Sequence, residues 1–121
     1  MGKAILIIDD EVQVIQMLKL LLCDDAERID GVTSAAQARS LLAEQAYDAV
    51  ISDICMPGES GLELLRAMSA VTPAARWVMI TAYNSRQVEE ECRAAGAAAF
   101  FAKPFHLGDV RAAVLQLLDA A

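Results

Sequence analysis

Apolar residues along this chain follow two alternating patterns. Short, nearly continuous apolar runs bounded by polar or turn residues are typical of buried strands in a parallel sheet. Between them, apolar residues recur three or four positions apart, which is the spacing of one helix face. The runs predict strands at residues 4–9, 28–33, 48–53, 76–81 and 97–102. The periodic segments predict helices at 11–23, 85–95 and 107–119, and two more that begin after Ser34 and Ser60.

The same spacing predicts which helix residues face the core. The expected inward residues are Val12, Ile15, Leu18, Leu22, Ala38, Leu41, Leu42, Leu62, Leu65, Met68, Val110, Val114, Leu117 and Leu118. Two helix starts carry the residues of a capping box, Ser34 with Gln37 and Ser60 with Glu63. The polar, glycine-containing segment 28–33 is expected to be a short edge strand. Regular alternation of strand and helix indicates an α/β domain with a parallel sheet.

Composition narrows the class of protein. A chain of 121 residues is long enough for one domain, 1–121, and too short for two. Its 56% apolar content fits a sheet covered on both faces, and its net charge of −7 argues against non-specific nucleic-acid binding. Apolar stretches are shorter than the roughly 18–20 residues that cross a bilayer. We therefore expect a soluble, cytoplasmic domain with no membrane contact.

The three cysteines are odd in number and far apart, at Cys23, Cys55 and Cys92. That pattern predicts reduced, buried thiols rather than a disulfide framework. A zinc site would need clustered ligands, and the single histidine is His106. Cys55 follows an acidic strand end in an expected loop, so oxidation of its thiol is a minor alternative.

Polar residues stand at the ends of four predicted strands. Asp9-Asp10 ends the first strand, Asp53 the third and Thr81 the fourth, while Lys103 follows the fifth. Ligands of open parallel sheets bind at the carboxyl ends of the strands. We therefore expect these residues to converge in space although they lie far apart in the sequence.

Carboxylates brought together in this way need a cation. Two of them about 4 Å apart repel by roughly 4 kcal/mol at an effective dielectric near 20. A site with oxygen ligands alone favours a hard ion such as Mg²⁺. A carboxylate beside a bound cation, a lysine and a hydroxyl has the chemistry of an aspartyl-phosphate acceptor.

These residues and their surroundings resemble the receiver domain of two-component response regulators, including chemotaxis-type regulators, over the whole chain. The matching residues are Ile8-Asp9-Asp10-Glu11, Asp53-Ile54-Cys55-Met56-Pro57-Gly58, Gly61, Thr81-Ala82 and Lys103-Pro104-Phe105. The resemblance implies a (βα)5 flavodoxin-like three-layer sandwich whose five-stranded parallel sheet has the order 2-1-3-4-5. It also implies a phosphoacceptor switch rather than an enzyme.

By this resemblance, Asp53 accepts a phosphoryl group from a sensor histidine kinase, a histidine phosphotransfer protein or a small phosphodonor. The metal would be Mg²⁺. Its implied ligands are Asp9, Asp10, Asp53 and the backbone carbonyl of Cys55. The family also leads us to expect a cis bond before Pro104, which the sequence by itself leaves open.

The resemblance also assigns the readout. Thr81 would hydrogen-bond the phosphoryl group, Lys103 would pair with it, and Phe100 would turn inward as the switch residue. The surface of the fourth helix, fifth strand and fifth helix would then bind a protein target or a second copy. Cys55 and Tyr83 occupy positions that affect phosphate lifetime. Because neither is acidic or an amide, we expect slow self-dephosphorylation.

Simpler interpretations stand beside these. Asp9-Asp10 could cap the first helix, Lys103 could be a solvated surface lysine, and Phe100 could be an ordinary core residue. Two rival functions remain: a receiver-like binding module that is not phosphorylated, and a Mg²⁺-dependent aspartyl phosphohydrolase. The phosphohydrolase usually has a second aspartate two residues after the nucleophile, where this chain has Cys55. The sequence also leaves open a stand-alone regulator or one part of a longer protein.

Overall fold

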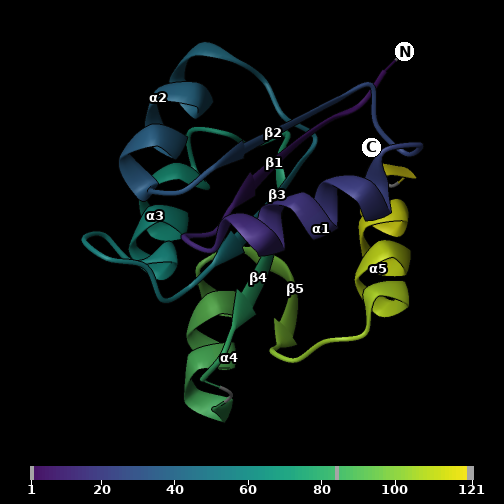
Figure 1. Cartoon of the computed structure of the whole chain (residues 1–121). Coiled ribbons are helices and arrows are strands. Elements are labelled where there is room, and N and C mark those ends of the chain that lie inside the picture. Colours follow the sequence, from purple (N-terminus) through teal and green to yellow (C-terminus); the bar gives the residue numbers. More distant parts are fainter. Residues whose placement is uncertain (1, 84, 120–121) are drawn as a thin grey trace.

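The computed structural model describes residues 2–83 and 85–119, which form alternating strands and helices (Figure 1). The strands are β1 (Ala4–Ile8), β2 (Arg28–Val32), β3 (Ala49–Asp53), β4 (Arg76–Thr81) and β5 (Ala97–Ala102). The helices are α1 (Val12–Leu22), α2 (Ala35–Glu44), α3 (Gly61–Met68), α4 (Arg86–Ala94) and α5 (Leu107–Asp119). The predicted elements are all present, with ends shifted by a few residues at most.

The five strands form one parallel sheet of order β2-β1-β3-β4-β5. This confirms the expected α/β class and strand order, and it places β2 at an edge as predicted. None of the helices within 2–83 and 85–119 combines the length and apolarity needed to span a membrane.

Two apolar clusters form the core, one on each face of the sheet. Alternate residues of β1 point to opposite faces: Ile5 and Ile7 pack with α1 and α5, whereas Leu6 and Ile8 pack with α2, α3 and α4. Figure 1 shows the resulting three layers, with α1 and α5 on one side of the sheet. Apolar residues cover both faces of the sheet, which accounts for the high apolar content of the chain.

Most predicted inward residues are buried, but Val12 was predicted wrongly. Its side chain is 54% exposed, whereas Ile15, Leu18 and Leu22 of the same helix are buried. Val12 is the first residue of α1, one turn before the first buried residue of the helix, Ile15. Three other predicted core leucines, Leu41, Leu62 and Leu117, are only half-buried.

The two predicted capping boxes differ in the structure. At α3, the Ser60 hydroxyl accepts from the Glu63 N–H, and the Glu63 carboxylate accepts from the Ser60 N–H, so the box is complete. At α2, the hydroxyl of Ser34 accepts from the N–H of Gln37, but the Gln37 amide oxygen accepts from the N–H and hydroxyl of Thr33. The α2 capping box is therefore incomplete, because the Gln37 side chain binds Thr33, the residue before the N-cap, instead of the N-cap residue Ser34.

The prediction of buried thiols holds for one cysteine in three. Cys92 is buried under α4, whereas Cys23 at the end of α1 and Cys55 after β3 are exposed. Cys23 is the C-cap residue of α1, and Cys55 lies in the loop between β3 and α3. All three thiols are free.

Candidate functional site

Strand register brings the predicted polar residues to one edge of the sheet. Ile8 pairs with Ser52, so Asp9 and Asp53, which follow them, lie side by side. On the other side of β3, Thr81 pairs with Ala102, and Lys103 comes next. The carboxyl ends of β1, β3, β4 and β5 therefore meet at one place, as the sequence predicts.

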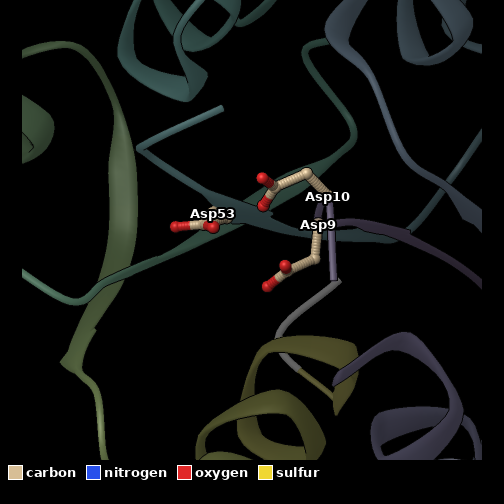
Figure 2. Close-up of side chains that lie close together, drawn as sticks. All are labelled: Asp9, Asp10 and Asp53. Atoms are coloured by element: carbon tan, nitrogen blue, oxygen red, sulfur yellow. The ribbon is translucent and has the colours of Figure 1, made fainter. Parts of the chain in front are cut away.

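Three carboxylates gather there (Figure 2). One ligand oxygen from each of Asp9, Asp10 and Asp53 lies within 4.8 Å of the other two. Asp9 and Asp53 are 2% and 5% exposed, whereas Asp10 is exposed to solvent. The cluster thus has a buried floor of two carboxylates and a third at its rim.

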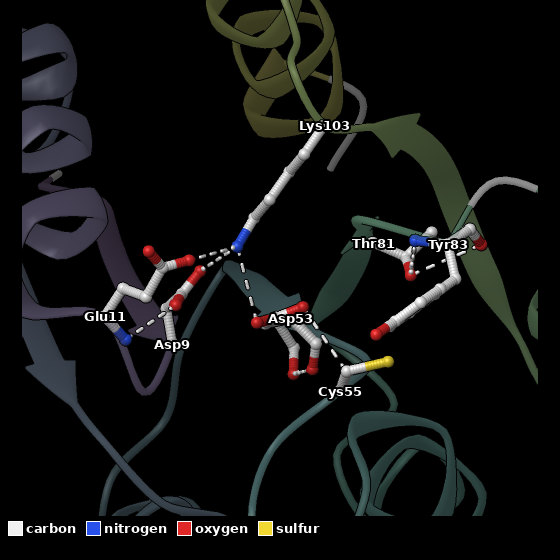
Figure 3. A network of polar contacts seen from close by, with 8 residues as sticks. Asp9, Glu11, Asp53, Cys55, Thr81, Tyr83 and Lys103 are labelled. Atoms are coloured by element: carbon white, nitrogen blue, oxygen red, sulfur yellow. Dashed lines mark hydrogen bonds and ion pairs between the residues drawn. The ribbon is translucent and has the colours of Figure 1, made fainter.

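Lys103 is the cation of this cluster. Its Nζ donates to Asp9 Oδ2 at 3.1 Å, to Glu11 Oε1 at 3.2 Å and to Asp53 Oδ2 at 3.4 Å (Figure 3). An ammonium has three N–H donors, so these three carboxylates use all of them. Burial would lower the Lys103 pKa, but the hydrogen bond with Asp9 and the charges of Asp53 and Asp9 outweigh it and raise that pKa.

The two buried carboxylates still carry an electrostatic penalty. Burial raises the pKa of Asp9, although the Glu11 N–H and Lys103 oppose the rise. Burial also raises the pKa of Asp53, the charge of Asp9 raises it further, and Lys103 only partly compensates. One lysine therefore does not neutralise the cluster, and a further cation would relieve the remaining repulsion.

The loop after β3 is held close to the site. The Cys55 N–H donates to Asp53 Oδ1 at 3.3 Å, and the Gly61 N–H donates to the Ile54 carbonyl. A Cβ on Gly61 would lie 2.0 Å from the Asp53 carbonyl oxygen, so only glycine allows this close approach. On α2, Arg39 binds the Glu59 carboxylate with two of its nitrogens and anchors the far part of the loop.

The donor set fits a hard divalent cation. It consists of the carboxylate oxygens of three aspartates, and oxygen ligands are those that Mg²⁺ and Ca²⁺ prefer. Two of the three carboxylates are buried and have raised pKa values, so their ionised forms gain most from a cation. Asp9, Asp10 and Asp53 are the side chains that could hold it.

Comparison with known proteins decides the family. The family model described as the response regulator receiver domain matches residues 5–115, which is most of the chain. This chain belongs to the response regulator receiver domain family. Its role is therefore that of a receiver domain of two-component response regulators.

Individual relatives agree with this assignment. The chain is 29% identical over 118 residues to sporulation initiation phosphotransferase F of Bacillus subtilis (strain 168), covering 98% of this chain and 95% of that protein. It is 33% identical over 113 residues to response regulator protein PilR of Pseudomonas aeruginosa, covering 93% of this chain but 25% of that protein. The chain thus spans almost all of one relative and about a quarter of the other.

A solved structure shows the same fold. The CheY-like receiver domain protein from Methanospirillum hungatei JF-1 superposes with a TM-score of 0.93 at 25% identity. The match covers 99% of this chain and 96% of that one. It agrees with the parallel sheet order found here.

Two residues of this receiver domain stand apart from the carboxylate cluster. The buried Thr81 hydroxyl accepts from the Tyr83 N–H at 3.0 Å, so it is engaged with its own loop. Phe100 on β5 is half-buried and packs against the cluster under α2, α3 and α4. In Figure 3, Lys103 is joined to Asp53, whereas Thr81 is joined only to Tyr83.

The structure adds one participant to which the sequence assigns no role. Glu11 follows the acidic pair, yet only the folded chain brings its carboxylate to Lys103, 92 residues away. The position of Glu11 directly after Asp9-Asp10 in the family motif could have marked it as a site residue. The motif does not specify where its side chain points. The Lys103–Pro104 peptide bond, which the sequence left open, is cis.

Proposed function

We propose that Asp53 is the phosphoacceptor of this receiver domain. The observation that carries the proposal is the Asp53 carboxylate itself, 5% exposed, paired with Lys103 and adjacent to two further aspartates. A carboxylate oxygen of Asp53 would attack the phosphorus of a phosphohistidine on a partner kinase or phosphotransfer protein. The new P–O bond replaces the P–N bond, and the histidine leaves with the bonding electron pair.

The metal in this proposal is Mg²⁺, held by Asp9, Asp10, Asp53 and the backbone carbonyl of Cys55. When bound, it neutralises charge on the transferring phosphoryl oxygens. The acidic pair contributes the negative potential that attracts the ion. Lys103, which contacts both Asp9 and Asp53, would supply a second positive charge as a point-charge partner for a phosphoryl oxygen.

The output of the switch is proposed at α4, β5 and α5. Thr81 would exchange its bond with the Tyr83 backbone for one to the phosphoryl group, and Phe100 would repack in the space that this movement opens. Phe100 packs at the partly exposed margin of the core on β5, the strand beside Thr81, which supports this role. The occupant of the changed surface would be a protein target or a second copy of the domain.

A donor protein needs a surface beside Asp53. An open hollow of about 570 Å³ lies next to Lys103, with mostly apolar walls formed by Glu11, Val14, Met17, Lys103, Pro104, Phe105 and Leu107. We propose that this hollow, between α1 and the loop that follows β5, receives the histidine-bearing partner in the cytoplasm. A partner seated there would bury the apolar walls, and it would contact Lys103, whose Nζ lies 3.4 Å from Asp53 Oδ2.

The test is intact-mass spectrometry after incubation with acetyl phosphate and Mg²⁺. We expect one phosphate adduct that disappears in Asp53→Asn and with EDTA, and that persists in a matched Asp24→Asn control. An adduct in Asp53→Asn would overturn the assignment. A protein that binds partners but takes up no phosphate would be a receiver-like binding module, and steady hydrolysis of a phosphate ester would indicate a phosphohydrolase.

Phosphate lifetime is part of the same proposal. Cys55 is exposed beside Asp53, and Tyr83 is 71% exposed in the β4–α4 loop. Neither side chain carries an acid or an amide that would orient an attacking water. We expect the adduct to decay slowly, and decay within seconds in the mass assay would contradict this.

A further inference from the structure

Glu11 is the third partner of Lys103 and differs from the other two in its exposure. Its Oε1 lies 3.2 Å from Lys103 Nζ, as close as the two aspartates, whose distances are 3.1 and 3.4 Å. The Glu11 side chain is 62% exposed, whereas those of Asp9 and Asp53 are 2% and 6% exposed. Figure 3 shows the lysine reaching between Glu11 and Asp9 on one side and Asp53 on the other.

All three N–H donors of Lys103 are used in this arrangement. If Asp53 takes up a phosphoryl group, Lys103 can donate to it only by giving up an existing partner or by sharing a donor. Releasing Asp9 would leave a buried carboxylate unpaired, which is costly. The contact with Asp53 is the longest of the three, and phosphorylation removes the charge of that carboxylate, so its donor can pass to the phosphoryl group. Of the two partners that remain, Glu11 returns to water at little cost, so Glu11 is the partner that competes with the phosphoryl group for Lys103 and can be released.

The contact that places Glu11 does not depend on its side chain. The Glu11 backbone N–H donates to Asp9 Oδ1 at 2.9 Å, which sets the path of the chain between β1 and α1. A change at the carboxylate therefore leaves that backbone contact in place. The carboxylate also adds negative charge beside the cation-binding aspartates.

We propose that Glu11 is a positioning residue that holds Lys103 in the unphosphorylated state and competes with the phosphoryl group for it. Two effects of opposite sign follow. The Glu11 charge favours binding of the divalent cation, and the Glu11–Lys103 ion pair opposes capture of the phosphoryl group. This inference rests on the proposed phosphoacceptor role of Asp53.

The test compares wild type, Glu11→Gln and a matched control, Glu44→Gln, which removes the same charge from the exposed end of α2. Calorimetric titration gives the Mg²⁺ affinity. At saturating Mg²⁺, a titration with beryllofluoride, a phosphoryl analogue, gives the affinity for the transferred group. Urea unfolding midpoints show whether either variant merely destabilises the fold.

For Glu11→Gln we expect weaker Mg²⁺ binding together with tighter beryllofluoride binding, by about 1.5- to 5-fold. That range is the effect expected of a solvent-exposed ion pair. A purely structural role would weaken both affinities together and lower the unfolding midpoint. The control should match wild type in both titrations.

The outcomes separate the two proposals. If wild type and Glu11→Gln both bind beryllofluoride with the same affinity, the role of Glu11 is overturned and Asp53 remains the acceptor. Weaker beryllofluoride binding by Glu11→Gln would overturn it as well. Wild type that binds no beryllofluoride and gains no phosphate would overturn the proposed function and this inference with it.

Discussion

Replacing Lys103 by methionine should destabilise the protein in a way that depends on pH. Methionine keeps most of the apolar stem of the side chain and removes the ammonium that touches Asp9 and Asp53. Breaking a buried ion pair on one side typically costs about 3–5 kcal/mol, because the remaining charge is left unpaired. Here two buried carboxylates would be left facing each other.

Protonation sets an upper limit on this cost. A buried carboxylate that is left unpaired can take up a proton instead of remaining charged. For a group with an ordinary pKa of 3.8, protonation at pH 7 costs about 4.4 kcal/mol of folding free energy, since each pKa unit corresponds to 1.36 kcal/mol. At pH 5 the same cost is only about 1.6 kcal/mol. The loss for Lys103→Met should therefore be about 3–4 kcal/mol at pH 7 and below about 2 kcal/mol at pH 5.

The sign follows from the direction of the pKa shifts. Asp9 and Asp53 already have raised pKa values, and removing the lysine raises them further. A carboxyl group with a raised pKa contributes stability that is complete below its unfolded value of 3.8 and is lost as pH rises through its folded value. The deficit of the variant should therefore grow as pH rises from about 4 to 7.

Urea unfolding followed by the fluorescence of the buried Trp77 measures this deficit at pH 5 and 7 in EDTA. Adding Asp53→Asn to the Lys103→Met background removes one of the unpaired charges and should recover part of the stability at pH 7. Mg²⁺ should recover part of it as well. A deficit that is the same at both pH values would refute the electrostatic reasoning and indicate lost packing of the lysine stem.

Three further predictions concern the surroundings of the site. Gly61→Ala should lower the free energy of unfolding in urea by several kcal/mol, because the new Cβ would lie 2.0 Å from the Asp53 carbonyl oxygen at the end of β3. Gly108→Ala, where a Cβ would meet no atom within 4 Å, should leave that free energy unchanged or raise it by up to about 1 kcal/mol. Single alanine changes at Arg39 or Glu59 should each lower the urea midpoint slightly, because the pair is exposed, and the double alanine variant should lose less than the two single losses added together. Losses that add in full would contradict a direct interaction between the two side chains. Burial, and a hydrogen bond to the Asp30 carboxylate on β2, raise the pKa of Tyr47 to about 12. The stability that this phenol contributes should therefore be complete below pH 10 and lost as the pH approaches 12. Tyr47→Phe should make the urea midpoint depend less on pH over that range, and an unchanged pH dependence would contradict this.

The order of strands and helices was predictable because it depends on short-range patterns. Short apolar runs, helical spacing and the Ser60 capping box act over a few residues, and the structure contains each of them. The strand-end positions of Asp9, Asp53 and Lys103 follow from the same patterns. Parallel strands place their carboxyl ends at one edge, so convergence of these residues required only that the alternation be recognised.

The tertiary structure decided what depends on neighbours far along the chain. It exposes Val12, which helical spacing placed inside, and Cys55, whose thiol the number and spacing of the cysteines predicted to be buried. It turns the Thr81 hydroxyl to the backbone of its own loop and brings Glu11 to Lys103. Burial, side-chain direction and the pKa of a carboxyl group depend on elements that are distant in the sequence and come together only in the folded chain. The sequence by itself therefore determined which groups meet at this edge of the sheet, and the fold determined which of them are paired, buried and free to move.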